Sequence, residues 1–198
     1  MSDTNNPLIA GLQPLVDRVR TDVTAVKRDG RQAWTRDPLT VARLAAHLNG
    51  GPARGVCPVR EGESVTLVGL LDFDSHGGET DWAAMSAAVA RVVDVLELAW
   101  GMEPVLFRSS GGRGVHLFLL WDEAQDCYSV REFLGDVLRS VGLRPGTRGV
   151  VHGEVEVFPR QDSVPVGGYG NQFVMPLAGA SMPLELREGG DDLEDLAG

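Results

Sequence analysis

The segment VTLVGLLDFDS (65–75) places two carboxylates at the end of a long apolar run, and it constrains the fold more than any other segment. Alternate residues of a strand point to the same face, so Asp72 and Asp74 leave the sheet side by side while the preceding apolar residues enter a core. Neighbouring carboxylates repel each other unless a cation neutralises them. The run therefore predicts a strand that ends in a divalent-metal site; the alternative is a strand that runs out into a polar turn.

The chain has 198 residues, enough for one domain with a substantial core. No apolar run approaches the roughly 18 residues of a membrane span, and no basic segment precedes an apolar stretch, so we expect neither a membrane span nor a signal peptide. Cys57 and Cys127 lie in unrelated contexts without a CxxC pair. We therefore expect no structural zinc, and the cysteine usage fits a cytoplasmic protein.

The formal net charge of −10 argues against a general nucleic-acid binder, but the charge is unevenly spread. Residues 185–198 contain six acidic side chains and one basic side chain. Several of the remaining acids are candidate metal ligands, whose charge a bound cation would reverse. Net charge alone therefore does not decide whether the protein binds nucleic acid.

Hydrophobic periodicity predicts an alternation of strands and helices. An apolar helical pattern, interrupted near Pro14, runs from Pro7 to about Lys27. The polar stretch DGRQ follows this pattern, and the segment 51–65 is typical of a short strand, a turn and the entry to the next strand. The other expected elements are helix 40–48, strand 65–73, helix 81–100 capped by Thr80, strand 103–108, strand 115–121, helix 127–141, strand 151–158 and strand 171–177.

From residue 65 this order is βαββαβ, so we predict an α+β fold with an RRM/ferredoxin-like core sheet. Right-handed crossovers place strand 65–73 between strands 151–158 and 115–121, antiparallel to both, with strand 103–108 outside. We expect three segments, namely an N-terminal helical and αβ subdomain (1–64), the RRM-like core (65–184) and an acidic tail or linker (185–198).

The predicted strand order brings polar residues from distant parts of the chain to one patch. The end of the DFD strand must lie beside the beginnings of two others, which carry His116, Glu154 and Glu156. Both glutamates share a face, so either can be the third acid, and a charged pair within an apolar strand is costly unless something binds it. Hard oxygen ligands favour Mg²⁺ or Mn²⁺ over Zn²⁺, and three such acids suit two-metal phosphoryl transfer.

The glycine-rich segment RSSGGRGVH (108–116) lies beside this patch. Its glycines permit a tight turn with exposed N–H groups, as in phosphate-binding loops; an ordinary glycine-rich hairpin is the alternative. Ser109, Ser110 and Arg113 can add polar contacts, and the imidazole of His116 can bind a phosphate oxygen. We therefore expect a triphosphate to bind here.

The ordered set DFD, SGGRGVH, EVFPRQD and GYGNQFVMPL resembles the archaeo-eukaryotic primase superfamily, and most closely the primase-polymerases of mobile elements, phages and conflict systems. The segment HLNGGPARGVCPV is also similar, so the resemblance covers about residues 39–177. It implies the primase fold and a template-directed nucleotidyltransferase, a DNA primase or polymerase that adds (d)NTPs to a 3′-hydroxyl.

In that family the DxD acids and a later acid bind metals, and the histidine motif and the FP-(K/R)-Q segment contact the nucleotide. The resemblance therefore implies metal-binding and catalytic roles for Asp72, Asp74 and Glu156, with Mg²⁺ or Mn²⁺ as cofactor. Position 160 holds Arg where Lys is frequent, and the chain carries neither a zinc module nor a helicase region. The nucleotide contacts implied are Ser110, Arg113, His116, Arg160 and Gln161, with Ser109 as a further candidate.

The implied partners are single-stranded DNA template and primer, nucleoside triphosphates, and a helicase in a longer parent protein or as a separate chain. Two other functions fit parts of the sequence. LLDFDS also matches a haloacid-dehalogenase-type phosphatase with Asp72 as nucleophile, but the single lysine, Lys27, lies upstream of it. A non-catalytic RRM-like nucleic-acid-binding module would stack bases on aromatic residues of the central strands, where Phe118 is the only candidate.

Overall fold

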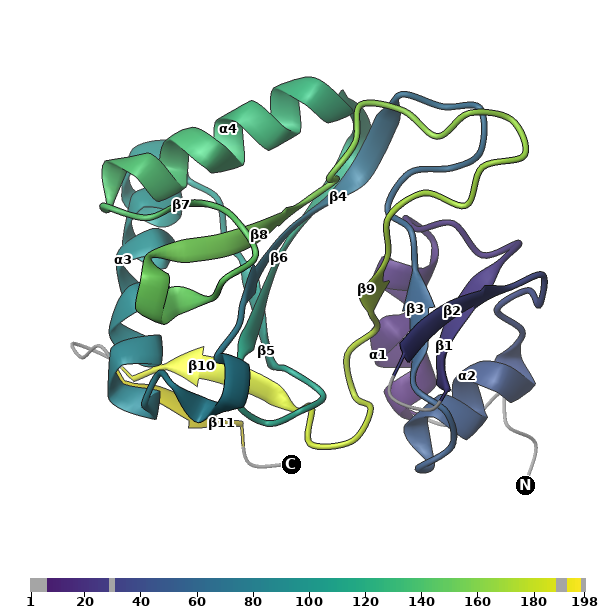
Figure 1. The fold of residues 1–198 in the computed structure, drawn as a ribbon, viewed down its shortest axis with the longest axis horizontal. Coiled ribbons are helices and arrows are strands. Elements are labelled where there is room, and N and C mark those ends of the chain that lie inside the picture. Colours follow the sequence, from purple (N-terminus) through teal and green to yellow (C-terminus); the bar gives the residue numbers. More distant parts are fainter. Residues whose placement is uncertain (1–6, 29–30, 188–191, 197–198) are drawn as a thin grey trace.

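The computed structural model describes residues 7–28, 31–187 and 192–196, and this part of the chain forms two β-sheets with four α-helices (Figure 1). The helices are α1 (Pro7–Val16), α2 (Val41–Leu48), α3 (Trp82–Trp100) and α4 (Cys127–Ser140). The large sheet has the order β11-β10-β5-β6-β4-β8-β7 and the small sheet β2-β1-β3-β9. The strands are β1 (Thr24–Arg28), β2 (Arg31–Thr35), β3 (Arg54–Val56), β4 (Val65–Phe73), β5 (Val105–Arg108), β6 (Val115–Asp126), β7 (Arg144–Pro145), β8 (Glu154–Phe158), β9 (Phe173–Val174), β10 (Pro183–Leu186) and β11 (Leu193–Asp195).

The predicted βαββαβ unit is confirmed by the four central strands, which lie in the order β8-β4-β6-β5 with β4 antiparallel to β6 and β8. Helices α3 and α4 cover one face of this sheet, where Leu71 and Phe73 pack into the main core. Because side chains alternate along a strand, Leu70 and Asp72 point to the opposite face.

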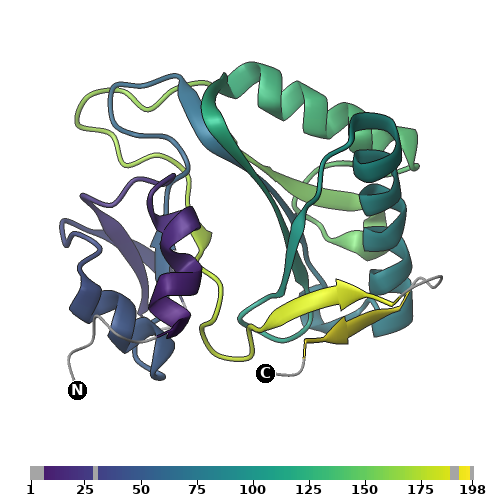
Figure 2. The ribbon, with the colours of Figure 1, turned by 180° about the vertical axis from the view of Figure 1, so that it is seen from behind.

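Part of that opposite face is covered by the small-sheet unit, which consists of the small sheet, α1 and α2, with α1 and β9 nearest to the large sheet (Figures 1 and 2). The aromatic rings of Phe118, Phe158 and Phe173 pack edge to face there, with Leu70 in the same cluster. His47 of α2 strengthens the small-sheet unit because its Nε2–H donates to the carbonyl of Pro176 (2.8 Å) while its Nδ1 accepts from the N–H of Arg54 (3.0 Å).

The N-terminal segment differs from the prediction of one helical pattern up to Lys27. Helix α1 ends at Val16, and residues 24–28 form β1, which pairs with β2 (31–35) as a hairpin. The segment contains β-branched residues whose spacing fits a strand as well as a helix, and Asp29-Gly30 is a common hairpin turn sequence. The strand β2 was not predicted, because the polar stretch DGRQ gave no apolar alternation.

The C-terminal segment also differs, since residues 183–186 and 193–195 form a hairpin that extends the large sheet beside β5. The predicted tail from residue 185 is therefore wrong for its described part. Leu184 and Leu193 are buried, and the indole N–H of Trp82 donates to the carbonyl of Leu193 (3.2 Å). The alternation places Glu185 and Glu194 outward, so the high acidic content marks an exposed hairpin face. The division at residue 64 stays a prediction.

Several element ends shift. The helix predicted from residue 81 begins at Trp82, and its cap is Asp81, whose carboxylate accepts from the N–H of Ala84, rather than Thr80. The first residues of the predicted strand 151–158 belong to a short 3₁₀ helix, Val150–His152. The predicted strands 171–177 and 103–108 shorten to β9 and to Val105–Arg108, whereas strand 115–121 extends to Asp126.

Cys57 and Cys127 are free and buried, and they share one small apolar cluster with Val59 and Val164, so their contexts are not unrelated as predicted. Across the described ranges, no helix combines the length and the apolar composition that crossing a bilayer requires.

Candidate metal and nucleotide site

One cross-strand row carries the residues that the sequence singled out. Asp72 of β4 lies directly opposite His116 of β6 on one side and Glu156 of β8 on the other. Directly opposite residues of antiparallel strands have Cα atoms about 4.5–5.5 Å apart and share a face. The predicted convergence of these three residues is therefore confirmed. The next row, which contains Leu70 and Phe118, is already buried beneath the small-sheet unit, so the site begins where that cover ends.

The surroundings of the three acidic side chains of the site disfavour their charged forms. Burial, followed by the charges of Asp74 and Glu156, raises the pKa of Asp72 well above its ordinary value. Burial also raises the pKa of Asp74 and of Glu156. One carboxylate oxygen of Asp72, Oδ1, is buried without a hydrogen-bond partner. A divalent cation would relieve both the repulsion and the missing contact, so this donor set fits Mg²⁺ or Mn²⁺.

The three acidic side chains of the site do not converge on one position that could hold a metal ion. Within the described ranges, no three His, Cys, Asp or Glu side chains are placed so as to hold a metal ion. Glu156 instead accepts from the guanidinium of Arg160 (Nη1 to Oε2, 3.2 Å). A bound ion would compete with Arg160 for the negative charge of Glu156.

Of the two glutamates of β8, Glu156 is the better candidate for the third acid. Glu154 accepts from the guanidinium groups of Arg148 (2.6 Å) and Arg144 (2.9 Å). The hydrogen bond from Arg148 is the main reason that the pKa of Glu154 falls to about 2. Two arginines already neutralise this carboxylate, which leaves it little affinity for a metal ion.

His116 is a neutral base held against the acids. Burial lowers the pKa of its imidazole to about 4. Its Nε2 lies 3.4 Å from Oδ1 of Asp72, a long contact that is not an ion pair because the ring is uncharged near neutral pH. Its Nδ1 is buried without a hydrogen-bond partner, which leaves this nitrogen unsatisfied beside the acids.

The glycine-rich turn between β5 and β6 is braced by Ser109. Its Oγ accepts from the N–H of Gly114 (3.0 Å), and its own N–H donates to the carbonyl of Gly114 (2.8 Å). Ser109 therefore shapes the turn, whereas Arg113 is exposed and Ser110 partly exposed at its tip. Position 114 requires glycine because an added Cβ would lie 2.4 Å from the carbonyl oxygen of Phe73.

Gln161 of the FPRQD motif organises the loop that follows β8. Its Oε1 accepts from the backbone N–H of Asn171 (2.8 Å), and its Nε2 donates to the carbonyl of Ser163 (2.8 Å). The side-chain amide is thus used within the loop, and its predicted nucleotide contact stays a prediction. Arg160, one residue earlier, is the member of the motif that reaches the acids.

His76 was missed by the sequence reasoning. It lies two residues beyond Asp74, and its Nε2–H donates to the carbonyl of Thr147 (2.8 Å). Its electrostatic effect opposes the rise that burial causes in the pKa of Asp74 and of Glu156, so it lies close to the acids. Its position directly after the DFDS motif was the only signal available.

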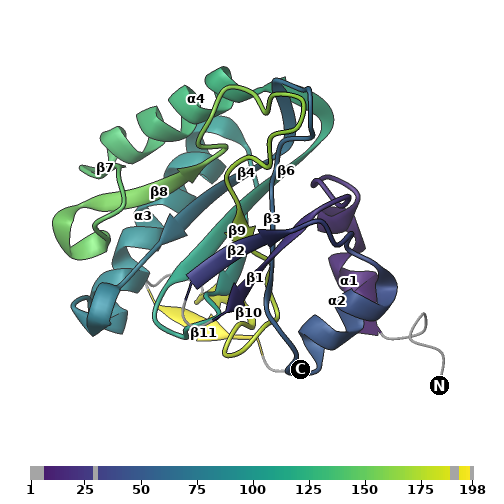
Figure 3. The ribbon, with the colours of Figure 1, turned by 45° about the vertical axis from the view of Figure 1, so that its right-hand side comes forward.

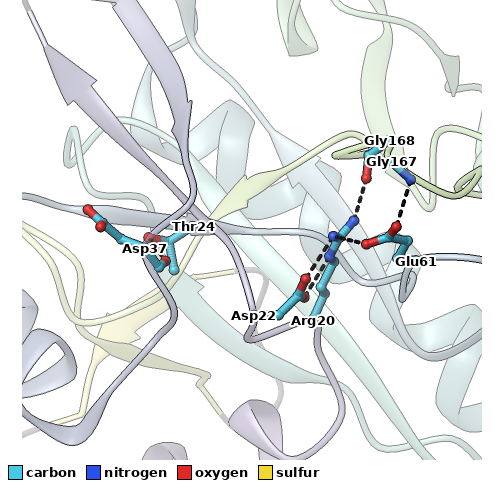
Figure 4. A network of polar contacts seen from close by, with 7 residues as sticks. All are labelled: Arg20, Asp22, Thr24, Asp37, Glu61, Gly167 and Gly168. Carbon is cyan, nitrogen blue, oxygen red and sulfur yellow. Dashed lines mark hydrogen bonds and ion pairs between the residues drawn. The ribbon is translucent and has the colours of Figure 1, made fainter.

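The loop after β8 crosses to the small sheet (Figure 3) and is fixed there by a buried arginine. Arg20, 3% exposed, donates to the carbonyl of Gly168 (2.6 Å) and to the carboxylates of Asp22 and Glu61 (Figure 4). Glu61 in turn accepts from the N–H of Gly167 (2.6 Å). This network joins the small-sheet unit to the loop that carries Gln161.

The family described as the archaeo-eukaryotic primase domain of TOTE conflict systems matches residues 13–184, which is most of the chain. The chain belongs to this family. Among solved structures, this primase domain is similar to the polymerase domain of Mycobacterium tuberculosis ligase D in complex with DNA. That likeness has 18% identity and a TM-score of 0.57, and it covers 86% of this chain and 72% of the other.

A second similar structure is the archaeo-eukaryotic primase domain of the cyanophage S-2L primase-polymerase. It has 15% identity and a TM-score of 0.46, with 79% of this chain and 90% of the other covered. No match was found among the curated proteins.

The fold weighs against both alternative functions of this primase domain. A dehalogenase-type phosphatase presents its DxD on a parallel doubly wound sheet, whereas β4 is antiparallel to both its neighbours. An RRM-like binder needs exposed aromatic rings, whereas Phe118 is 2% exposed beneath the small-sheet unit.

Proposed function

We propose that this primase domain is a template-directed nucleotidyltransferase that adds (d)NTPs to a 3′-hydroxyl on a single-stranded DNA template. The observation that carries the proposal is the row of His116, Asp72 and Glu156 on three adjacent strands. Membership of the primase family and the fold shared with a DNA polymerase domain support it. The hydroxyl forms a bond to the α-phosphate, pyrophosphate leaves, and the hydroxyl proton is lost to solvent.

Each side chain has a distinct role in this proposal. Asp72, Asp74 and Glu156 hold two Mg²⁺ or Mn²⁺ ions, which when bound stabilise the charge that develops on the phosphoryl oxygens. His116 and the turn residues Ser110 and Arg113 bind the triphosphate, with Arg160 beside Glu156. Ser109 and Gln161 position the turn and the loop. A single-stranded DNA template, a primer and a helicase remain predicted partners.

The first prediction tests the acids directly. The double substitution Asp72→Asn plus Asp74→Asn should abolish nucleotide incorporation on a primed single-stranded template in Mg²⁺ and in Mn²⁺, because the ligands lose their charge. Asp94→Asn on the exposed face of α3 makes the same chemical change away from the site and should keep full activity. The measurement is extension of a labelled primer with ATP or dATP as substrate. Undiminished extension by the double variant would refute the proposed function.

A further inference from the structure

A cavity of about 270 Å³ opens beside the proposed metal site, at the edge of the large sheet. Arg131 of α4 and Arg160 after β8 line it, together with Thr147, Glu156 and Val157. Drug-sized ligands occupy pockets of about 300–1,000 Å³, so this cavity suits a smaller group than a whole nucleotide. Arg131 has no role in the site described above, whereas the carbonyl of Thr147 accepts from His76.

The backbone of β8 contributes to the cavity. The edge strand β7 pairs with β8 only at Glu154 and Val155, and the carbonyl of Val155 accepts from the N–H of Gly146 (3.0 Å). Residues two apart in a strand direct their backbone groups to the same side. Val157 therefore directs its N–H and carbonyl toward the cavity that it lines, beyond the end of β7.

The two arginines are only partly engaged. Arg131 contacts Asp162 through one nitrogen (2.6 Å), and Arg160 contacts Glu156 through one nitrogen (3.2 Å). A guanidinium has five N–H donors in a planar fork, so each can still bind an anion. Asp162 is largely exposed, with 61% of its side chain accessible, so it neutralises Arg131 weakly.

We propose that this cavity is a phosphate-binding subsite, in which Arg131 and Arg160 hold one phosphate group of a substrate whose reacting end lies at Glu156. The subsite takes either the tail of a nucleoside triphosphate or a phosphodiester of a nucleic-acid strand. The inference rests on the proposed nucleotidyl transfer for its role, but the binding it describes requires no catalysis.

The test compares two arginines on the same helix. Arg131→Gln removes the cavity arginine, whereas Arg139→Gln removes an exposed arginine of α4 that is also ion-paired, with Asp136 at 2.7 Å. Binding of inorganic tripolyphosphate and of an oligothymidylate without a 5′-phosphate is measured by titration calorimetry, at low salt and without divalent metal. Arg131→Gln should weaken one or both about tenfold, as expected for one charge-assisted contact, and Arg139→Gln neither.

Asp162→Asn should have the opposite effect on affinity. It releases Arg131 from the carboxylate of Asp162, so it should tighten binding of whichever probe Arg131→Gln weakens. This exposed substitution keeps the test decisive even if Arg131→Gln fails to fold. A loss with tripolyphosphate assigns the subsite to a triphosphate tail, and a loss with the oligothymidylate alone assigns it to a strand. Equal constants for the wild type, Arg131→Gln and Asp162→Asn with both probes would overturn the proposal while leaving the polymerase assay unaffected.

Discussion

At Asp72 the proposed metal-binding role conflicts with the stability of the fold. Its Oδ1 is buried without a hydrogen-bond partner, and burial, followed by the charges of two further carboxylates, raises its pKa. A buried unsatisfied polar group costs about 1–3 kcal/mol. The backbone places Asp72 in the centre of the row of His116, Asp72 and Glu156. Without metal, the free energy of unfolding is therefore lower than it would be with an uncharged side chain at this position.

We therefore expect Asp72→Asn to raise the melting temperature in the absence of divalent metal, by about 2–4 °C for each 1 kcal/mol in a chain of this size. Added Mn²⁺ should stabilise the wild type by mass action and stabilise the variant much less. Thermal unfolding with chelator and with Mn²⁺ measures both effects. A variant that melts lower than the wild type in chelator would contradict this account of Asp72.

The stability that Glu154 contributes to the fold depends on pH. Its pKa is lowered to about 2 by Arg148 and Arg144, so its contribution to stability is complete above the ordinary glutamate pKa and is lost as the pH falls toward 2. Glu154→Gln should be less stable than the wild type at neutral pH, and the difference should shrink between about pH 4.5 and pH 2. Unfolding by urea across this range is the measurement; a constant difference would show that the two arginines do not act through the carboxylate charge.

At the residue scale, the strand order was enough to predict that Asp72, His116 and Glu156 meet. The strand order could not distinguish Glu154 from Glu156, because the arginines that form ion pairs with Glu154 come from a segment without hydrophobic periodicity. The internal uses of Ser109 and Gln161 depend on hydrogen bonds whose partners, Gly114 and Asn171, only the three-dimensional loop conformation identifies.

Among the elements, the turn between β5 and β6 depends on one close approach. A Cβ at Gly114 would lie 2.4 Å from the carbonyl oxygen of Phe73, at the end of the strand that carries Asp72. Gly111, in the same turn, has nothing within 4 Å of an added Cβ. The two glycines therefore differ in what a methyl group would meet.

Gly114→Ala should destabilise the protein by about 1–3 kcal/mol, the usual cost of overpacking, and should raise the KM for nucleotide by moving the turn away from β4. Gly111→Ala should change neither quantity. Steady-state primer extension and chemical denaturation of both variants provide the measurement. Equal behaviour of the two would show that β4 yields to the extra methyl group.

The accuracy of the element prediction followed the strength of each pattern. The apolar run of β4 was bounded correctly at Val65 and Phe73. The segment 17–28 failed because Val19, Val23 and Val26 satisfy a helical spacing, whereas pairing with β2 and β3 makes residues 24–28 a strand. Long-range pairing also converts the acidic C-terminal segment into strands, which composition alone could not indicate.

On the scale of the whole molecule, Arg20 joins the small-sheet unit to the loop after β8. Arg20→Ala removes charge-assisted hydrogen bonds to Asp22 and Glu61 and the contact to the Gly168 carbonyl. Since both acids remain accessible to water, we expect a loss of about 1–3 kcal/mol rather than the larger cost of stranding a buried charge.

Amide hydrogen exchange should accelerate in residues 161–170 of the Arg20→Ala variant, while exchange in α3 and α4 stays slow. Arg91→Ala, at an exposed position of α3, provides the matched control and should leave the loop unchanged. Slow exchange throughout the loop of the Arg20→Ala variant would show that Arg20 is not what holds it.

The strand β9 has a consequence for synthesis of the chain. It completes the small sheet by pairing with β3, although most of the large sheet lies between the two in sequence. A ribosome adding about 5–20 residues per second leaves the β3 edge bare for on the order of ten seconds. During that interval the nascent N-terminal unit presents an open edge to chaperones. It acquires its last strand only after Asp72, His116 and Glu156 have all been translated.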